Sequence, residues 1–572
     1  MSLKSISHQV EFCVVGGGLA GMGAAVAAAR CGVKTLLMHE RPMPGGNASS
    51  EIRMWVCGSP QLLETGLIEE LRLENDYRNP NSNFAIWDTI TYEMVAMQEN
   101  LTVLFNCSCL DAVTENGRII SVKGYQQTTQ QFHEVKADFF ADCSGDSILA
   151  PLTGAEFRIG REAKCEFGES LAQDSPDRRT MGMSCLLQAR ETGVPQKFIP
   201  PKWAHSYPTE ESFPARNHNM GRTQNFWWVE LGGMADSIAD TEKLRDELLK
   251  TMIGIWDHMK NHGDHKVDNY DVDWIGFLPG KRESRRYVGD HIINQQDIES
   301  GVPFYDTVAY GGWPIDDHHP GGIAHRGSAN INIKLKSPYT IPLRSLYSCN
   351  ISNLLFAGRN ISASHTALSS TRVMATCMLL GQAAGTAVAV ALKNGKDIRQ
   401  TALEDYEEIQ QLLMDHDCTL PGFRRRIAES VKQAVLTGSC GDPEVLRNGV
   451  DRDYPGEENA WSGKNGDFAA YEYEKETAFS TIRLVFDSDL DRRIIGNSHL
   501  NSVAHYFLNA PERKTPETIM QSFAIIADDR EIIRVTENHQ RVVWIKLPFK
   551  AKRIEFRPLD PEAKKVFAFE VR

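Results

Sequence analysis

Three features that are common in other protein classes are missing from this sequence. The 12 cysteines form no Cys-x-x-Cys pair, and the nearest two are Cys107 and Cys109. The chain therefore lacks the dithiol of a disulfide reductase and the usual spacing of an iron–sulfur protein. The first residues, MSLKSISHQ, hold no apolar stretch of signal-peptide length, and no later run reaches about 18 apolar residues. We expect reduced thiols, no membrane span and a cytoplasmic location.

Positive charge is also in short supply. The chain carries 62 Lys and Arg against 75 Asp and Glu, a net charge of −13, and no basic stripe stands out. This balance argues against nucleic acid or an anionic membrane as a partner. A length of 572 residues, 41% of them hydrophobic, predicts a globular protein of several domains.

The segment that organises the chain begins at Val10 and reads VEFCVVGGGLAGMGAAVAAARCGVKTLLMHE. An apolar strand-like run leads into a GxGxxG motif and an alanine-rich helix, and a second apolar run ends at Glu40. In this context Gly16 permits a tight turn, Gly18 lets the backbone approach a pyrophosphate, and Gly21 allows the helix to pack closely on the strand. The helix N-terminus favours phosphates, and Glu40 can accept hydrogen bonds from a ribose. The segment predicts dinucleotide binding; the alternative is a glycine-rich turn without a ligand.

Three later glycine turns extend this prediction. The polar loop after Glu40 can contact the second half of a two-phosphate cofactor, unless it is a plain surface turn. The apolar runs 139–143 and 353–360 each lead to a glycine beside a charged residue. A polar approach loop and a helix over 371–395 with a small-residue face follow the second run. The residues concerned are Gly45, Gly46, Asn47, Ser49, Gly145, Asp146, Gly358 and Arg359.

Polar side chains that can meet a substrate gather between Leu278 and His365. The piece LPGKRESRRYVGD places three arginines close together, which suits carboxylate or phosphate binding but fits structural ion pairs equally well. The loop YGGWPIDDHHPGGIAHRG is so rich in Gly and Pro that we expect a pocket wall without helix or strand. Its adjacent histidines are a weak case for a metal, and we predict none. The candidates are Arg282, Arg285, Arg286, Tyr310, Trp313, His318, His319, His325, Arg326 and His365.

Together these segments resemble the FAD-dependent oxidoreductases with a glutathione-reductase-type FAD fold, a group distantly similar to fumarate reductase and succinate dehydrogenase flavoproteins. The resemblance covers residues 10–396 and rests on GGGLAG with Glu40, GGNAS, DCSGD and NLLFAGRNISASH…GQAAG. It implies FAD as cofactor, with the late helix pointing its N-terminus at the flavin, where its dipole stabilises the reduced, negatively charged form. No fumarate-reductase arginine motif and no histidine for covalent flavin attachment can be aligned. The implied FAD contacts are Gly16, Gly18, Leu19, Ala20, Gly21, Glu40, Arg41, Gly45, Gly46, Asn47, Ser49, Gly145, Asp146, Gly358, Arg359 and Ala375.

The C-terminal region has a different character. From residue 445, short strand-like runs divided by turn residues predict an all-β sandwich. Its opening, VLRNGVDRDYPGEENAWSG, resembles galactose-binding-like (discoidin-type) modules around Asn459, Ala460 and Trp461. Such modules bind carbohydrate or serve in packing and dimer formation, and we favour packing because no aromatic platform is evident. The expected strands cover 469–473, 481–486, 523–527, 541–547, 553–556 and 566–571.

Further strands are expected at 101–105, 183–189 and 225–231, with a hairpin pair at 119–125 and 133–135. An amphipathic helix is expected over 241–262, and residues 401–429 are expected to be helical. We therefore predict an α/β protein. A Rossmann-like FAD-binding domain takes residues 1–150 and returns at 341–440, an α+β substrate domain is inserted at 151–340, and a β-sandwich follows at 445–572. The chain is expected to act without nucleic acid or membrane, and a homo-oligomer is an open option.

The expected function is hydride transfer between flavin N5 and a small organic substrate, either a sugar or polyol or a hydroxylated or unsaturated acid. His365 is the first candidate for acid–base catalysis, because histidine titrates near the working pH. Tyr310 and His319 are the next candidates for this role, and Arg282 and Arg286 are the candidates for binding the substrate. The alternative is a carbohydrate-binding or scaffold protein that keeps FAD as a structural ligand. A tRNA-modifying flavoprotein is disfavoured by the acidic charge.

Overall fold

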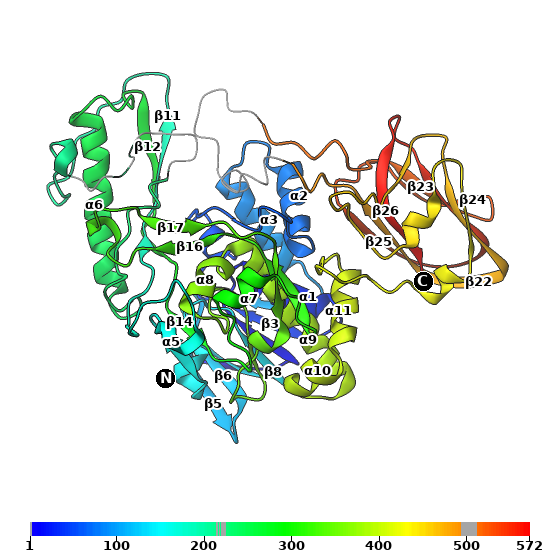
Figure 1. The fold of residues 1–572 in the computed structure, drawn as a ribbon, viewed down its shortest axis with the longest axis horizontal. Coiled ribbons are helices and arrows are strands. Elements are labelled where there is room, and N and C mark those ends of the chain that lie inside the picture. Colours follow the sequence, from blue (N-terminus) through cyan, green and yellow to red (C-terminus); the bar gives the residue numbers. More distant parts are fainter. Residues whose placement is uncertain (1–2, 213–215, 217, 219–224, 493–511) are drawn as a thin grey trace. The chain divides into compact units, whose positions relative to one another are not determined.

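A computed structural model describes residues 3–212, 216, 218, 225–492 and 512–572 (Figure 1). The chain divides into two compact units. The first unit takes the described residues up to Glu64 and those from Asn81 to Gln410, so it contains the predicted insert and most of both predicted FAD-binding segments, without residues 65–80 and 411–440. The second unit takes residues 65–80 and most of the chain from Gln411 onward, which places its start before the predicted residue 445.

The first unit is built on a five-stranded parallel sheet in the order β19-β8-β2-β3-β4. All five strands were predicted, and four are completely buried, as parallel strands covered on both faces should be. This confirms the Rossmann-type fold. The strands are β2 (Phe12–Val15), β3 (Thr35–Met38), β4 (Leu101–Leu104), β8 (Phe139–Asp142) and β19 (Leu354–Phe356).

Two helices that are far apart in the sequence, α1 (Leu19–Arg30) and α9 (Met374–Asn394), pack against each other. Small residues make this possible, because a Cβ on Gly381 would lie only 1.9 Å from the carbonyl oxygen of Ala20. Helix α9 is long and apolar enough to cross a membrane, but 89% of its apolar window is buried inside the structure. Its hydrophobicity is that of a core helix.

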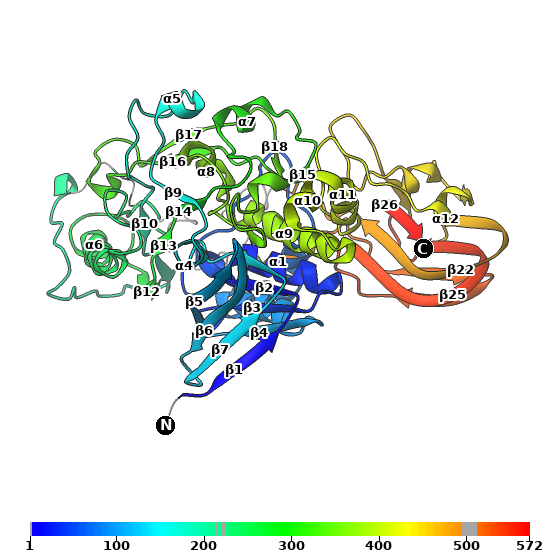
Figure 2. The same ribbon diagram turned by 90° about the horizontal axis from the view of Figure 1, so that it is seen from below.

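A second sheet in the first unit has four strands in the order β1-β7-β6-β5 (Figure 2). The predicted hairpin at 119–125 and 133–135 is confirmed as β6 (Arg118–Gln126) and β7 (Gln131–Lys136). The two outer strands, β1 (Ser5–Gln9) and β5 (Cys107–Glu115), were not predicted. Most of their residues are polar or exposed, so no apolar run marks them in the sequence.

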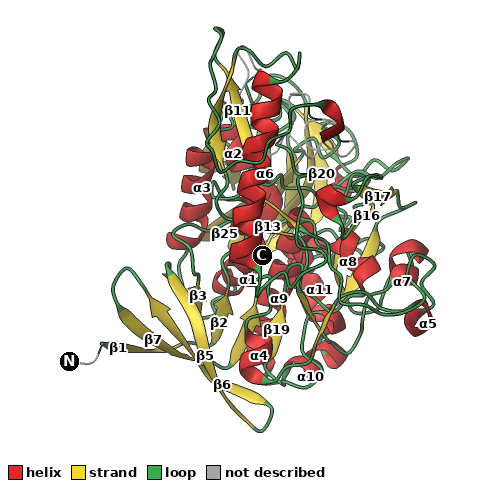
Figure 3. Ribbon diagram, turned by 90° about the vertical axis from the view of Figure 1, so that its left-hand side faces the viewer, coloured by secondary structure: helices red, strands yellow, loops and turns green. Residues whose placement is uncertain are grey.

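The predicted insert is organised by the amphipathic helix α6 (Thr241–Asn261), which lies beside β11 in Figure 3 and matches the predicted 241–262. The strand expected at 225–231 was wrong, because Phe226 has a φ of 57° and the chain turns at Trp227 and Trp228. These residues are apolar because they pack in the core with α6. The expected strand 183–189 is divided in two. The strands here are β10 (Met183–Ser184), β11 (Leu187–Glu191), β12 (Tyr270–Ile275) and β13 (Gly280–Lys281).

Two segments predicted as loops are regular. The Gly- and Pro-rich stretch contains strand β16 (Ile315–His318), which pairs antiparallel with β17 (Asn330–Ile333) just after the stretch. The expected approach loop is helix α8 (His365–Thr371), capped by the Ser364 side chain, which accepts from the backbone N–H of Ala367. The remaining longer elements are α3 (Phe84–Ala96), α4 (Leu149–Thr153), β9 (Phe157–Ile159), α5 (Lys164–Phe167), β14 (Arg285–Tyr287), α7 (Gln295–Ser300), β15 (Thr307–Gly311), β18 (Tyr339–Pro342) and α10 (Ile398–Glu404).

The second unit is rich in antiparallel sheet, as predicted. Seven strands form one sheet, and two strands of 18 and 17 residues, β22 (Ala469–Phe486) and β25 (Val542–Pro558), run through it. Each was predicted as two short strands, because bulges interrupt the pairing of β22 with β25. Its galactose-binding-like character stays a prediction. The other strands are β20 (Val435–Gly438), β21 (Trp461–Gly463), β23 (Phe523–Ala527), β24 (Arg530–Val535) and β26 (Lys564–Val571).

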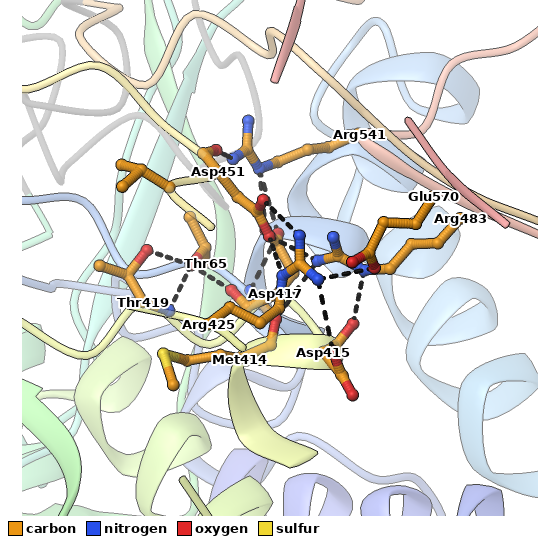
Figure 4. A network of polar contacts seen from close by, with 12 residues as sticks. Thr65, Met414, Asp415, Asp417, Thr419, Arg425, Asp451, Arg483, Arg541 and Glu570 are labelled. Carbon is orange, nitrogen blue, oxygen red and sulfur yellow. Dashed lines mark hydrogen bonds and ion pairs between the residues drawn. The ribbon is translucent and has the colours of Figure 1, made fainter. Parts of the chain in front are cut away.

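The helical stretch expected at 401–429 is only partly helical. Helix α11 covers Tyr406–Asp415, and the chain then has no helix until α12 (Glu429–Lys432). Part of the irregular stretch joins a buried ionic network in the second unit (Figure 4). There the Arg425 guanidinium meets Asp451 at 3.3 Å and Glu570 at 2.6 Å. Helix α2 (Leu67–Arg78) belongs to the same unit.

Candidate active site

A cavity of about 470 Å³ lies within the first unit. It opens where loops follow the carboxyl ends of β2, β3, β8 and β19, the place at which open α/β sheets bind ligands. The predicted glycine turns all meet here although they come from distant parts of the chain. At this end the cavity is lined by Gly16–Ala20, His39–Arg41, Gly45–Asn47, Cys143–Asp146, Gly358, Arg359, Val373 and Met374.

The glycines form a cradle, and two of them, Gly16 and Gly46, leave no room for a side chain. Gly16 has a φ of +100°, and a Cβ there would lie 2.5 Å from the carbonyl carbon of Cys143. A Cβ on Gly46 would lie 2.9 Å from the Cα of Gly18. The first turn of α1 carries no side-chain cap and no acidic residue. Its N–H groups are therefore free to meet phosphate oxygens.

Three of the predicted FAD contacts do not line the cavity. Gly21 packs beneath the cradle, where a Cβ would lie 1.8 Å from the carbonyl oxygen of Gly16. The Ser49 hydroxyl donates to the carbonyl of Gly46 at 2.8 Å and so shapes the loop from behind. Ala375 follows the lining residue Met374 on α9, and its N–H donates to a backbone carbonyl. All three support the lining residues.

His39 supports the cradle and was not predicted. The backbone N–H of Gly17 donates to its Nδ1 at 2.9 Å, and its Nε2 lies 2.9 Å from the carbonyl oxygen of Met43. Since a carbonyl only accepts, Nε2 carries the proton and Nδ1 the lone pair. The ring ties the first glycine turn to the loop after Glu40.

Asp146 collects two cations at the cavity wall. The Lys281 ammonium lies 2.6 Å and the Arg359 guanidinium 2.7 Å from its carboxylate, and the Ser284 hydroxyl donates to it. Burial raises the pKa of Asp146, but the neighbouring cations and hydrogen bonds outweigh it and lower that pKa to about 2. The group therefore carries one surplus positive charge. Lys281 was not predicted, although it stands beside Arg282 in the sequence.

This donor set fits FAD. The pyrophosphate brings two negative charges, and the wall offers backbone N–H groups, the surplus cation and two partly unpartnered guanidinium groups. Arg41 Nη1 and Arg359 Nε are buried and, within the described chain, have no hydrogen-bond partner. Glu40 faces the same space and can accept from ribose hydroxyls. When bound, FAD would supply a carrier for two electrons.

The far part of the cavity is lined by Arg282, Asp316, His318 and Arg372. Glu230 does not line the cavity but contacts Arg282 and His318, and we call these five residues the His318 cluster. His318 Nδ1 lies 2.7 Å from Glu230, and its Nε2 lies 3.4 Å from Asp316. Arg282 pairs with Glu230 at 3.0 Å and Arg372 with Asp316 at 3.2 Å. Burial raises the pKa of Glu230, but Arg282 and His318 outweigh it and lower that pKa.

Aromatic and amide side chains complete this part. The rings of Trp227 and His318 meet edge to face with centroids 5.2 Å apart, and Trp313 also lines the cavity. Asn330 donates to Asp316, while Asn332 lines the cavity from the same strand, β17. Glu230, Asp316, Asn332 and Arg372 were not predicted. Only the hairpin β16–β17 and the turn at Trp227 bring them together.

The structure revises the predicted catalytic set. Arg282 lines the cavity, but its charge is matched by Glu230. Arg286 is 1% exposed and pairs with Glu162 and Glu283 away from the cavity, so the structural alternative holds for it. Tyr310 is buried, and its hydroxyl donates to the carbonyl of Leu63 at 2.7 Å. His319 is exposed and stacks on His325.

His365 also lies outside the cavity lining. Its Nδ1 is 2.9 Å from Glu283 and its Nε2 is 3.1 Å from Asp317, so both ring nitrogens are occupied. Burial lowers the pKa of His365, but the two carboxylates outweigh it and raise that pKa to about 10. The ring holds its proton at neutral pH, so its geometry suits an ion pair and not a general base. Two other histidines line the cavity, His39 at the glycine cradle and His318 in the polar cluster.

Comparisons with known proteins bear on this cavity. The family described as FAD dependent oxidoreductase matches residues 11–413. A search of curated proteins finds no match. Among solved structures, a geranylgeranyl bacteriochlorophyll reductase-like protein from Thermoplasma acidophilum is 13% identical over 72% of this chain and 88% of that chain, with a TM-score of 0.30. A p-nitrophenol 4-monooxygenase from Pseudomonas putida DLL-E4 is 11% identical over 72% and 91%, with a TM-score of 0.32. Likenesses this weak carry no argument about fold or substrate.

Proposed function

We propose a function for this chain from one premise: the chain belongs to the family of FAD-dependent oxidoreductases. The glycine cradle and the cationic wall around Asp146 fit the cofactor. The proposed chemistry beyond the family depends on the His318 cluster, because four of its five residues line the same cavity as the cradle. The proposed activity is the two-electron oxidation or reduction of a small hydroxylated substrate.

His318 is the proposed proton-transfer group. Glu230 is anionic and accepts from Nδ1, which fixes the ring orientation and leaves Nε2 for exchange with a substrate hydroxyl. The 3.4 Å between Nε2 and Asp316 is too long for a strong hydrogen bond. When the proton arrives at Nε2, Glu230 and Asp316 stabilise the imidazolium that forms. The histidine therefore has the orientation and the electrostatic support that a general base requires.

The substrate class follows from the charges and the aromatic walls. Arg282 and Arg372 are each paired with a carboxylate, so this end of the cavity offers little surplus charge for an anionic substrate. It offers instead carboxylate and amide groups beside Trp227 and Trp313. This mixture suits a neutral polyol or sugar, whose hydroxyls need both donors and acceptors. We place the hydroxylated and unsaturated acids second.

We also propose a cytoplasmic location, because the cysteines are unpaired. All 12 are free thiols in the structure, including Cys107 and Cys109, which share strand β5. Unpaired thiols in this number are usual in a reducing compartment.

An anaerobic titration of the purified protein tests the function. The visible flavin band is followed while sugars and polyols, hydroxy acids, and reduced nicotinamide nucleotides are added separately. Bleaching by the neutral hydroxylated class supports the proposal, and bleaching by acids alone contradicts the substrate assignment. A flavin that no organic substrate reduces or reoxidises would favour the alternative of a scaffold that keeps FAD as a structural ligand. A protein that takes up no FAD would contradict the cofactor itself.

A further inference from the structure

A second cluster of histidines lies in the first unit and is separate from the cavity. Glu210, His218, His258 and His265 converge there, and their ligand atoms all lie within 4.8 Å of one another. The three imidazoles are 11%, 0% and 7% exposed, whereas Glu210 is 61% exposed at the rim. Three histidines buried around one carboxylate are uncommon in a protein core, since each imidazole must find a polar partner.

The spacing of these atoms fits a tetrahedral metal ion. Nε2 of His258 and Nε2 of His265 each lie 3.3 Å from Oε1 of Glu210, and they lie 3.1 Å from each other. Nε2 of His218 lies 3.2 Å from Oε2 of the same carboxylate. Tetrahedral Zn²⁺ with bonds of about 2.0–2.1 Å separates its ligand atoms by about 3.3 Å. The separations among His258, His265 and Oε1 of Glu210 are close to this edge length, and all four ligand atoms lie within 4.8 Å of one another.

The far side of two rings fixes the atoms that face inward. His258 Nδ1 donates to the carbonyl of Tyr207 at 2.7 Å, and His218 Nδ1 donates to the carbonyl of Arg216 at 2.9 Å. In the neutral ring this places the lone pair on Nε2, which points at the Glu210 carboxylate. Lone pairs of nitrogen and oxygen repel each other at this distance unless a proton or a metal cation lies between them. Carbonyl partners on the outer nitrogen are typical of metal-bound histidine.

We propose that Glu210, His218, His258 and His265 bind one Zn²⁺ ion. Three imidazoles and one carboxylate match the nitrogen and oxygen preferences of Zn²⁺. With four protein ligands the coordination is closed, which is the arrangement of structural zinc sites. His258 stands 17 residues along α6 from Thr241, a residue that lines the cavity, so the two sites are about 26 Å apart along the helix. The ion therefore serves folding and not the redox reaction.

The ion would add a link between segments that hydrogen bonds, such as that from His258 Nδ1 to the carbonyl of Tyr207, already join. Glu210 begins the short helix Glu210–Ser212, His258 lies near the end of α6, and His265 lies in the turn that follows α6. Linking them holds Glu210 and His218 beside His258 of α6 and His265. Because no such site exists in the unfolded chain, zinc binding adds directly to the free energy of unfolding.

Metal analysis of the untagged, full-length protein tests the site. The protein is dialysed against a weak chelator, loaded with Zn²⁺ and analysed by inductively coupled plasma mass spectrometry. We expect one zinc per chain in the wild type and in His262→Ala, since His262 stands on the same helix but pairs with Asp257. We expect Glu210→Gln and His218→Ala to lose the bound zinc. Zinc retained equally by all four proteins, or bound by none, would overturn the proposal.

X-ray absorption at the zinc edge separates this site from adventitious binding. Four nitrogen or oxygen ligands at about 2.0–2.1 Å, with imidazole scattering, would support it. Six oxygen ligands without imidazole would contradict it. The far-ultraviolet circular dichroism and the FAD content of each variant show that the fold survives. The zinc measurements do not depend on flavin reduction, so the zinc site and the proposed function can each be contradicted without the other.

Discussion

Two buried ionic clusters, one in each unit, are made from the same kinds of side chain. The His318 cluster in the first unit pairs Arg282 and Arg372 with two carboxylates and faces a cavity of about 470 Å³. The network around Arg425 in the second unit is at least as well paired (Figure 4). Beside it the structure leaves only about 30 Å³, which is too small for an organic ligand.

The comparison shows that buried charge alone does not mark a functional site. In the second unit Arg425 and Arg483 both pair with Asp451, and both guanidinium groups are at most 1% exposed. Their partners come from the chain itself, so the network holds separate strands and loops together. In the first unit Nε2 of His318 has only the longer contact of 3.4 Å to Asp316. The His318 cluster has room for a ligand beside it, and the network around Arg425 does not.

Of the substitutions considered, one in the cavity is expected to have the largest effect. Replacing His318 by Gln keeps a hydrogen bond to Glu230 but removes the proton acceptor. We expect the rate of substrate-dependent flavin reduction to fall by about 10²- to 10⁴-fold, the usual contribution of a general base, with FAD retained. Stopped-flow absorbance under anaerobic conditions measures it. An unchanged rate would remove His318 from the reaction.

Replacing Arg425 should lower the stability of the protein without changing its activity. Arg425→Met leaves Asp451 and Glu570 short of a buried cation, which costs about 3–5 kcal/mol. Denaturant unfolding followed by circular dichroism should show a lower midpoint, while the flavin reduction rate of the folded protein stays near that of the wild type.

A matched control for Arg425 is Arg534→Met. Arg534 is 52% exposed and pairs with Glu531 on the same strand. An exposed pair of this kind contributes about 0–1 kcal/mol. Equal losses in the two variants would mean that burial is not what makes the network stabilising.

His365 should give stability a dependence on alkaline pH. Its folded pKa, near 10, lies above the unfolded value of about 6.5. The contribution is therefore complete below pH 6.5 and is lost as pH rises toward 10. We expect about 2–4 kcal/mol to disappear between pH 7 and pH 10. Unfolding curves of His365→Asn, less stable throughout, should be flatter over this range; a slope equal to that of the wild type would contradict the ion pair.

The smallest effect is expected at His319, the neighbour of the proposed base. Its ring is exposed and contacts His325 outside the cavity. His319→Ala should leave both the flavin reduction rate and the unfolding midpoint close to those of the wild type. A large loss of rate would mean that the two adjacent histidines have the opposite roles.

The sequence by itself determined the cofactor half of the protein. Strand, glycine turn, helix and acid lie within Val10–Glu40, so the local pattern already specifies the backbone that a dinucleotide needs. The parallel strands were equally clear, because strands covered on both faces must be continuous apolar runs.

Only the tertiary structure decided which side chains serve the chemistry. His318 and His319 are adjacent, and side chains at successive positions of a strand point to opposite faces, so the register of β16 selects one of them. Glu230 contacts His318 because the chain turns just before it, at a place where the apolar sequence predicted a strand. The proposed zinc ligands likewise are not spaced at the repeat of a helix or a strand. Contacts between residues distant in sequence depend on how the elements pack, and no local pattern records that.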